Sequence, residues 1–201
     1  MKFWLDLALE TVRDPQKTAA RIMEWNFSRS ELYMALLAVS AMNAFLAGVS
    51  NVMSPIAADP ATIQAVPMLA LLQRPLALFV LIAAGLLVSV HALFWGGRLM
   101  GGAGTLTDML VLLTWLQALR AAAQVIILVL TLTVPALAGF VALLVVVTAF
   151  WLLLHFISAA LRFESLFRAL GVLIAVMAGL LLGLMVLLTL AGVTAGGLTN
   201  V

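Results

Sequence analysis

The chain has 201 residues, of which 66% are hydrophobic and 9% are charged, and its formal net charge is +2. A soluble domain of this length keeps too much surface in water to hide so much apolar material in one core, so the composition excludes that class and indicates a protein whose solvent is mostly lipid. The small excess of Lys and Arg gives no reason to expect nucleic-acid binding, and the absence of cysteine excludes disulfides, thiolate metal ligands and a cysteine nucleophile.

The first 31 residues mix five Lys or Arg and five Asp or Glu with apolar and aromatic side chains. Such a segment is too charged to cross a bilayer and too apolar to stay in water, so residues 1–31 are expected to form an interfacial amphipathic segment on the cytoplasmic side. Asp14 and Pro15 make a good helix start, because Asp accepts hydrogen bonds from free N–H groups and Pro suits the first helical position. We therefore predict a short amphipathic helix from Pro15 toward Trp25.

Five apolar runs follow, each about 18 to 25 residues long and therefore long enough to cross about 30 Å of hydrocarbon as a helix. They cover residues 32–49, 76–95, 109–133, 136–160 and 169–191. The proline-rich stretch between the first two runs is expected to stay a loop with at most one short surface helix. Residues 193–201 are expected to form a short external tail. The predicted fold is all-α, an integral membrane bundle of five transmembrane helices within residues 32–192.

The distribution of Lys and Arg between the two sides predicts the orientation of the bundle. Arg74 is the only Lys or Arg on one side, and the other side carries Lys2, Arg13, Lys17, Arg21, Arg29, Arg98, Arg162 and Arg168. The basic side is expected to be cytoplasmic, with the N-terminus inside and the C-terminus outside. All five tryptophans lie on or toward that same side. By default they anchor helix ends against lipid; the alternative is a surface that binds a partner.

A polar stripe on the third run is the sharpest anomaly among the predicted spans. Arg120 lies about 16 Å along this helix, near the bilayer middle, where Arg costs about 2.5 to 3.5 kcal/mol on insertion scales. Within about 60° of one another on a helical wheel are Gln117, Arg120, Gln124 and Thr131. We expect this stripe to face the bundle interior. By default it is a structural hydrogen-bonded cluster between helices, and the alternative is a polar pathway or a site for an anionic ligand.

The last run carries small residues at a strict spacing of four, namely Gly171, Ala175, Gly179 and Gly183. Small side chains clear one face of a helix for close contact with another helix. Packing within the bundle is the default interpretation of this face, and homodimerisation is the alternative.

A glycine-rich segment joins the second and third runs and contains Gly96, Gly97, Arg98, Gly101, Gly102, Gly104 and Thr105. It lacks the Lys-Ser/Thr pair of a phosphate-binding loop and no strand precedes it, so a nucleotide site is excluded. The glycines are expected to let the chain turn in a cytoplasmic loop, after which Thr107 can cap the third helix.

The remaining ionisable residues do not form a reactive set. His91 and His155 have no carboxylate or thiol at metal-ligand spacing, so we interpret them as satisfied interfacial histidines. Asp108 and Glu164 are single carboxylates near helix ends and are not paired with a base or a nucleophile. We therefore expect no catalytic site, no metal and no cofactor.

Several short motifs, taken in their order and spacing, give the chain a resemblance to the Yip domain family (Ypt-interacting proteins). They are Arg13-Asp14-Pro15, Gly101-Gly102-Ala103-Gly104-Thr105, Thr114-Trp115-Leu116-Gln117 and Trp151-Leu152-Leu153-Leu154-His155-Phe156. The resemblance covers most of the chain, is closest to the bacterial branch, and implies a five-span protein with a cytoplasmic N-terminus in the bacterial inner membrane.

In eukaryotic members the family resemblance implies binding of prenylated Rab-type GTPases. This chain lacks the Asp-Leu-Tyr-Gly-Pro element, and Tyr33 is its only tyrosine, so GTPase binding is not carried over. The first functional hypothesis is a non-enzymatic interaction or organising protein that contacts membrane lipids and either a protein partner at its cytoplasmic face or a second copy. The second is a small transporter or lipid-handling protein that works through the Arg120 stripe.

Overall fold

The computed structural model describes residues 2–53 and 74–190, and every regular element within them is an α-helix. Two short helices, α1 (Lys2–Arg13) and α2 (Pro15–Met23), precede the long ones. The long helices are α3 (Arg29–Met53), α6 (Pro75–Leu99), α7 (Leu106–Thr133), α8 (Pro135–Leu161) and α9 (Leu166–Leu190). Five helices in the described ranges are long and apolar enough to cross a membrane. The predicted all-α fold with five such helices is confirmed, and the chain is an integral membrane protein.

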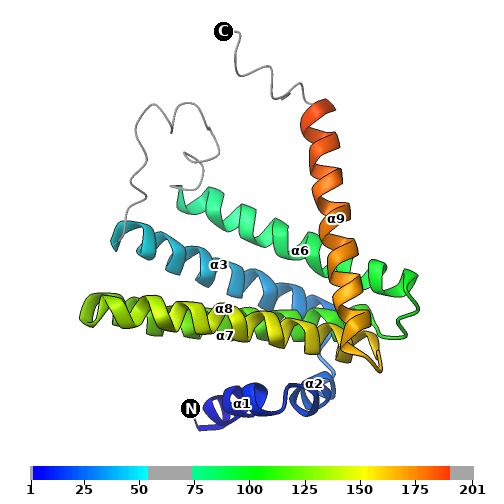
Figure 1. Ribbon diagram of the computed structural model, residues 1–201, viewed down its shortest axis with the longest axis horizontal. Coiled ribbons are helices and arrows are strands. Elements are labelled where there is room, and N and C mark those ends of the chain that lie inside the picture. The colour runs from blue at the N-terminus through cyan, green and yellow to red at the C-terminus, as the bar shows by residue number, and fades with distance from the viewer. Residues whose placement is uncertain (1, 54–73, 191–201) are drawn as a thin grey trace.

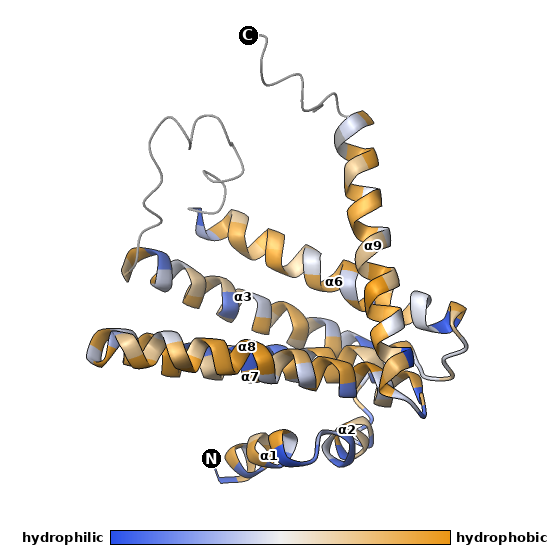
Figure 2. Cartoon of the chain, viewed as in Figure 1, coloured by the Kyte–Doolittle hydropathy of each residue, from blue (hydrophilic) through white to orange (hydrophobic). Residues whose placement is uncertain are grey.

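Four of the long helices lie alongside one another, and the α6–α7 and α8–α9 connections lie at the same end of the group (Figure 1). The short helices α1 and α2 pack against α7 and α8, on the side away from α6 and α9. Figure 2 shows that hydrophobic residues dominate the long helices, whereas hydrophilic residues gather on α1, α2 and the connections.

The buried core lies toward the end of the bundle that carries these connections. The first half of α7 and the second half of α8 contribute many of its fully buried side chains, including Leu110, Leu112, Phe156, Ile157 and Leu161. Toward the opposite end, most side chains of α7 and α8 are exposed and apolar, as expected where lipid rather than protein surrounds a helix. Tight packing is therefore concentrated around the connections.

Asp14 begins α2 as the sequence predicts. Its Oδ1 accepts a hydrogen bond from Lys17 N at 3.1 Å, and Pro15 occupies the first turn. The helix ends at Met23, two residues before the predicted limit at Trp25. Within residues 1–31 only this one helix was expected, but residues before Asp14 form a second helix, α1.

The predicted glycine loop is wrong at its start. Gly96, Gly97 and Arg98 belong to the last turn of α6. Only Gly101, Gly102 and Gly104 lie in the turn itself. Helix α6 continues to Leu99, about one turn beyond the predicted end at residue 95, and at Gly97 its backbone lies so close to the side chain of Leu161 that a Cβ there would overlap it.

The cap of α7 is Thr105 rather than Thr107. Thr105 Oγ1 accepts a hydrogen bond from Asp108 N at 3.1 Å, and Asp108 Oδ2 accepts one from Thr105 N at 3.0 Å. Both groups would otherwise be unsatisfied at a helix start, so the reciprocal pair explains why α7 begins at Leu106.

Helix α9 packs on α6 and α8 only through its first half, where Ala169, Val172 and Leu173 are buried. Its second half stands away from the other helices (Figure 1). Met100 approaches Gly171, but Gly179 and Gly183 have no neighbour within 4 Å among the described residues. The default prediction that this small-residue face packs within the bundle is therefore wrong beyond Gly171, because α9 diverges from α6 and α8. Most of the predicted proline-rich loop and all of the predicted tail at 193–201 lie outside the described residues.

Candidate functional site

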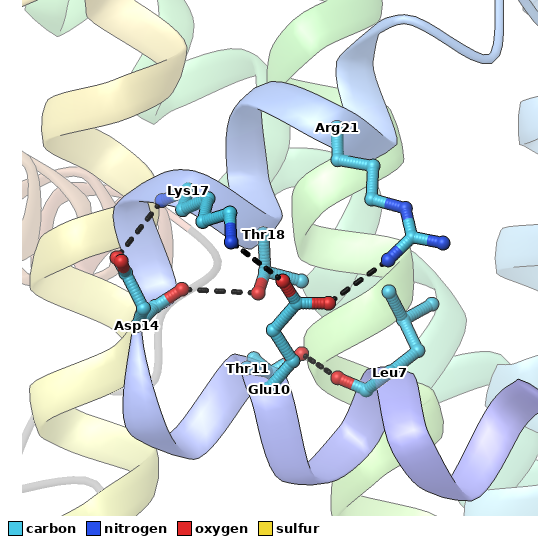
Figure 3. Close-up of polar contacts among 7 residues, drawn as sticks. All are labelled: Leu7, Glu10, Thr11, Asp14, Lys17, Thr18 and Arg21. Atoms are coloured by element: carbon cyan, nitrogen blue, oxygen red, sulfur yellow. Dashed lines mark hydrogen bonds and ion pairs between the residues drawn. The ribbon is translucent and has the colours of Figure 1, made fainter.

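Helices α1 and α2 form a hairpin that a single carboxylate holds closed. Glu10 Oε2 accepts a hydrogen bond from Arg21 Nη1 at 2.9 Å, and Glu10 Oε1 lies 3.5 Å from Lys17 Nζ. Figure 3 shows Glu10 on α1 reaching between these two side chains of α2. The ion pairs are partly exposed, so their contribution is small, but they fix the angle at which α1 folds back along α2.

The hairpin docks on the bundle through buried side chains of both short helices. Leu7, Ala19 and Ile22 belong to the same apolar core as the first half of α7 and the second half of α8. Thr11 is 0% exposed, and its hydroxyl donates to Leu7 O at 2.7 Å while accepting from Trp115 Nε1 at 3.1 Å. The Trp115 bond links α1 to α7 across 104 residues of sequence. The N-terminal segment is thus part of the folded domain.

An aromatic cluster surrounds this hydrogen bond and consists of Phe3, Trp4, Trp25, Phe27 and Trp115. The Trp4 ring lies 6.0 Å from the ring of Trp25 and 6.0 Å from the ring of Trp115, measured between centroids. These separations are typical of favourable aromatic pairs. The cluster therefore joins α1, the α2–α3 connection and α7, which the sequence alone could not place together.

An apolar groove of about 750 Å³ runs from the aromatic cluster between the hairpin, α3 and α7. Five alanines line it where larger side chains would fill it, namely Ala8, Ala35, Ala38, Ala118 and Ala122. The lining includes two polar side chains, Glu31 and Thr114. The Glu31 carboxylate accepts two hydrogen bonds of 2.7 Å from Ser28, one from its backbone N–H and one from its hydroxyl. Sequence reasoning missed the groove, although the spacing of the alanines on each helix was a signal for it.

The polar stripe on α7 is divided between two environments. Gln117 accepts a hydrogen bond from Asn43 Nδ2 at its backbone oxygen, over 3.3 Å, and Gln124 Nε2 donates to Ser50 Oγ over 2.9 Å. These bonds join α7 to α3, as the interpretation of a structural cluster requires. Sequence reasoning missed Asn43 and Ser50, whose spacing of seven residues matches that of their partners on α7.

Arg120 lies outside this seam between α3 and α7, so the prediction that it faces the bundle interior is wrong. Its side chain is exposed, and its guanidinium makes no hydrogen bond or ion pair with the described part of the chain. Each residue turns a helix by about 100°, so side chains near one another on the wheel still point in different directions. Arg120 points to one side of the α3–α7 contact, whereas Gln117 and Gln124 lie at it. Thr131, the last member, donates to Ile127 O within its own helix at 2.8 Å.

The glycine turn packs against the end of α8. Ala103 N donates to Leu161 O at 3.0 Å, and a Cβ on Gly104 would overlap the carbonyl oxygen of Ala160. Glycine is therefore required at position 104 by close backbone contact. Arg98 on α6 and Thr105 on α7 lie on either side of this turn, where Thr105 acts as the helix cap and Arg98 is exposed.

Both histidines are hydrogen-bonded within the membrane domain. His91 Nδ1 pairs with Leu87 O at 2.8 Å and its Nε2 with Tyr33 Oη at 3.1 Å. His155 Nδ1 pairs with Trp151 O at 2.9 Å. Residues 2–53 and 74–190 contain no group of three His, Cys, Asp or Glu side chains that could hold a metal ion.

Comparison with known families decides what this arrangement is. The Yip1 domain model matches residues 9–188. The chain belongs to the Yip1 domain family. The matched range in this Yip1-domain protein begins within α1 and ends within α9, so it includes the end of α1, all of α2 and nearly all of the five long helices. No curated protein and no solved structure matches the chain.

Proposed function

We propose that this Yip1-domain protein is a non-enzymatic membrane protein that organises or recruits other molecules through its cytoplasmic face. The observation that carries the proposal is the α1–α2 hairpin, which is held closed by Glu10 and docked on the bundle through Thr11 and Trp115. A fixed hairpin presents one defined surface, whereas a loose terminal segment would present many.

The outer surface of the hairpin suits both lipid and protein contact. On α1, Leu5, Leu9 and Val12 lie one helical turn apart and are exposed, as in helices that insert one face into the interface. On α2 most of the exposed side chains are polar or charged, and they include Lys17 and Arg21. The apolar stripe therefore fits the bilayer surface and the polar face of α2 fits a partner in water.

We infer that the N-terminus is cytoplasmic and the membrane is a bacterial inner membrane. Arg29, Arg98, Arg162 and Arg168 lie at the helix ends on the side of the α6–α7 and α8–α9 connections. Clusters of basic residues in short loops favour the cytoplasmic side. An alkaline phosphatase fused after residue 201 is expected to be active outside, and an inactive fusion would contradict this orientation.

Site-specific photo-crosslinking in cells tests the proposed role. A photoreactive residue at Gln16, exposed on α2, is expected to give a discrete adduct with a protein partner or a second copy. The matched control is Thr133, exposed at the opposite end of the bundle. Adducts at both positions in equal yield, or at neither, would contradict recruitment by the hairpin.

The alternative function, a small transporter or lipid-handling protein, needs the polar stripe to act as one pathway. Gln117 and Gln124 contribute to hydrogen bonds between α3 and α7, whereas Arg120 is exposed. This division favours the interaction role. Flux or lipid scrambling in proteoliposomes that is lost in Arg120→Leu would reverse the preference.

A further inference from the structure

We propose that the groove between the hairpin, α3 and α7 is a binding site for one hydrocarbon chain of a membrane phospholipid. The inference goes beyond the interaction role, because it requires no protein partner. A volume of about 750 Å³ lies within the range of small-molecule sites, which is about 300 to 1,000 Å³.

The lining selects an apolar occupant. The two polar side chains of the lining offer little to a ligand, since Ser28 engages the Glu31 carboxylate and the Thr114 hydroxyl, which is unpaired among the described residues, is buried. A polar ligand would lose its hydration without gaining hydrogen bonds from these side chains. A hydrocarbon chain has no hydration to lose, and it exchanges contacts with other lipid chains for contacts with the aliphatic and aromatic walls.

The groove opens onto the lipid-facing side of the bundle. This position favours a lipid chain over other apolar ligands. Ala35, Ala38 and Met42 line it and are also exposed on α3, one of the five helices able to span a membrane. Leu5 continues the opening onto the exposed apolar stripe of α1. Acyl chains are the most abundant apolar groups at such an opening, so one of them reaches the groove without leaving the bilayer.

The mouth of the groove is suited to the headgroup of a phospholipid. Tryptophans favour the level of the lipid headgroups, and Trp4, Trp25 and Trp115 line this end. The guanidinium of Arg21 lies 5.6 Å from the centroid of the Phe3 ring, which belongs to the same aromatic cluster. Arg21 therefore brings a cation to the aromatic end of the groove, where it also pairs with Glu10, and the Glu31 carboxylate of the lining is bonded to Ser28.

Quenching of tryptophan fluorescence tests the site in the full-length protein. The protein carries Trp95→Phe and Trp151→Phe, so that only the three groove tryptophans remain, and it is held in dodecyl maltoside micelles. Phosphatidylglycerol brominated on its acyl chains is then added. We expect quenching that saturates near one lipid per protein, and at least a twofold lower plateau in Ala118→Phe, whose ring fills the groove.

Matched variants separate a site from general lipid contact. Ala84→Phe adds the same ring to the exposed surface of α6 and is expected to leave the plateau unchanged. Ala38→Phe repeats the block from exposed α3, which keeps the test valid if Ala118→Phe fails to fold. Quenching that rises linearly with lipid and is equal in all variants would overturn the site. So would a dimer in native mass spectrometry whose groove tryptophans resist quenching, because a second copy would then occupy the groove.

Discussion

Trp115 Nε1 donates a hydrogen bond to Thr11 Oγ1 over 3.1 Å, and the same hydroxyl donates to Leu7 O over 2.7 Å. The threonine hydroxyl thus uses its donor and an acceptor position at once, inside a region closed to solvent. This pair is the most specific polar link between the N-terminal hairpin and the membrane domain, and its loss has a predictable effect.

Thr11→Val is expected to destabilise the protein by about 1 to 3 kcal/mol, because the half-buried Trp115 loses the acceptor of its indole N–H. Thermal unfolding in detergent, followed by circular dichroism, measures the change. Adding Trp115→Phe to Thr11→Val should cost less than the sum of the two single changes, since the second removes the unsatisfied donor. Additive losses would show that the two residues do not interact.

Thr114→Val is expected to have the opposite sign. Thr114 is 9% exposed, and its Oγ1 is buried with no hydrogen-bond partner among the described residues. Replacing an unsatisfied hydroxyl by a methyl group of similar size removes a desolvation cost, so stability should be unchanged or rise by about 1 kcal/mol. A loss as large as that of Thr11→Val would mean that the hydroxyl has a partner.

Asn43→Ala and Arg120→Leu form a contrasting pair on the α3–α7 side of the bundle. Asn43→Ala removes an interhelical hydrogen bond, and such bonds contribute about 0.6 kcal/mol on average and up to about 1.7 kcal/mol in membrane proteins. Arg120→Leu removes an exposed cation and should not destabilise the protein, because Leu suits lipid better than Arg does. Unfolding by sodium dodecyl sulfate in mixed micelles compares them, and destabilisation by Arg120→Leu would place the guanidinium in a structural contact.

Gly104→Ala and Gly85→Ala separate a glycine required by packing from one that is not. A Cβ at Gly104 would overlap Ala160 O, so the backbone must shift at a cost of about 1 to 3 kcal/mol. At Gly85, in α6, a Cβ meets nothing within 4 Å, and Ala should stabilise the helix by about 0.5 to 1 kcal/mol. The same unfolding assay measures both, and equal effects would contradict the close contact between the turn and α8.

Glu10→Gln is expected to loosen α1 without unfolding the bundle. Its ion pairs with Lys17 and Arg21 are partly exposed and together contribute on the order of 0.2 to 1 kcal/mol. Amide hydrogen exchange should therefore be several times faster in α1 and unchanged in α8. The control Glu24→Gln removes an exposed carboxylate that is in no ion pair with the described residues, and it should leave α1 unaffected.

Apolar length and helix-start signals were enough to predict most of the fold. Runs of hydrophobic residues predicted five spanning helices because each run has only to match the thickness of a bilayer. Asp14 and Pro15 predicted the start of α2 because capping is local. The cap of α7 was assigned to Thr107 instead of Thr105, since either threonine satisfies a local rule and only the position of Asp108 distinguishes them.

The candidate site depends on relationships that local rules do not contain. The groove requires the hairpin to fold back on α7, and the stripe divides because α3 covers Gln117 and Gln124 but not Arg120. Helical periodicity places these three residues near one another, but it does not show which of them the neighbouring helix α3 covers. The divergence of α9 has the same origin, because a small-residue face permits close packing without specifying a partner.

The bonds between α3 and α7 also bear on how the protein is made. Asn43 and Ser50 precede their partners by 74 residues, so at roughly 5 to 20 residues per second α3 waits about 4 to 15 s for α7 to be synthesised. In the folded protein Asn43 also bonds Val39 O and Ser50 also bonds Leu46 O, both within α3, and these bonds do not require α7. The first span can therefore enter the bilayer alone with its polar side chains satisfied, and add the bonds to α7 when the third span arrives.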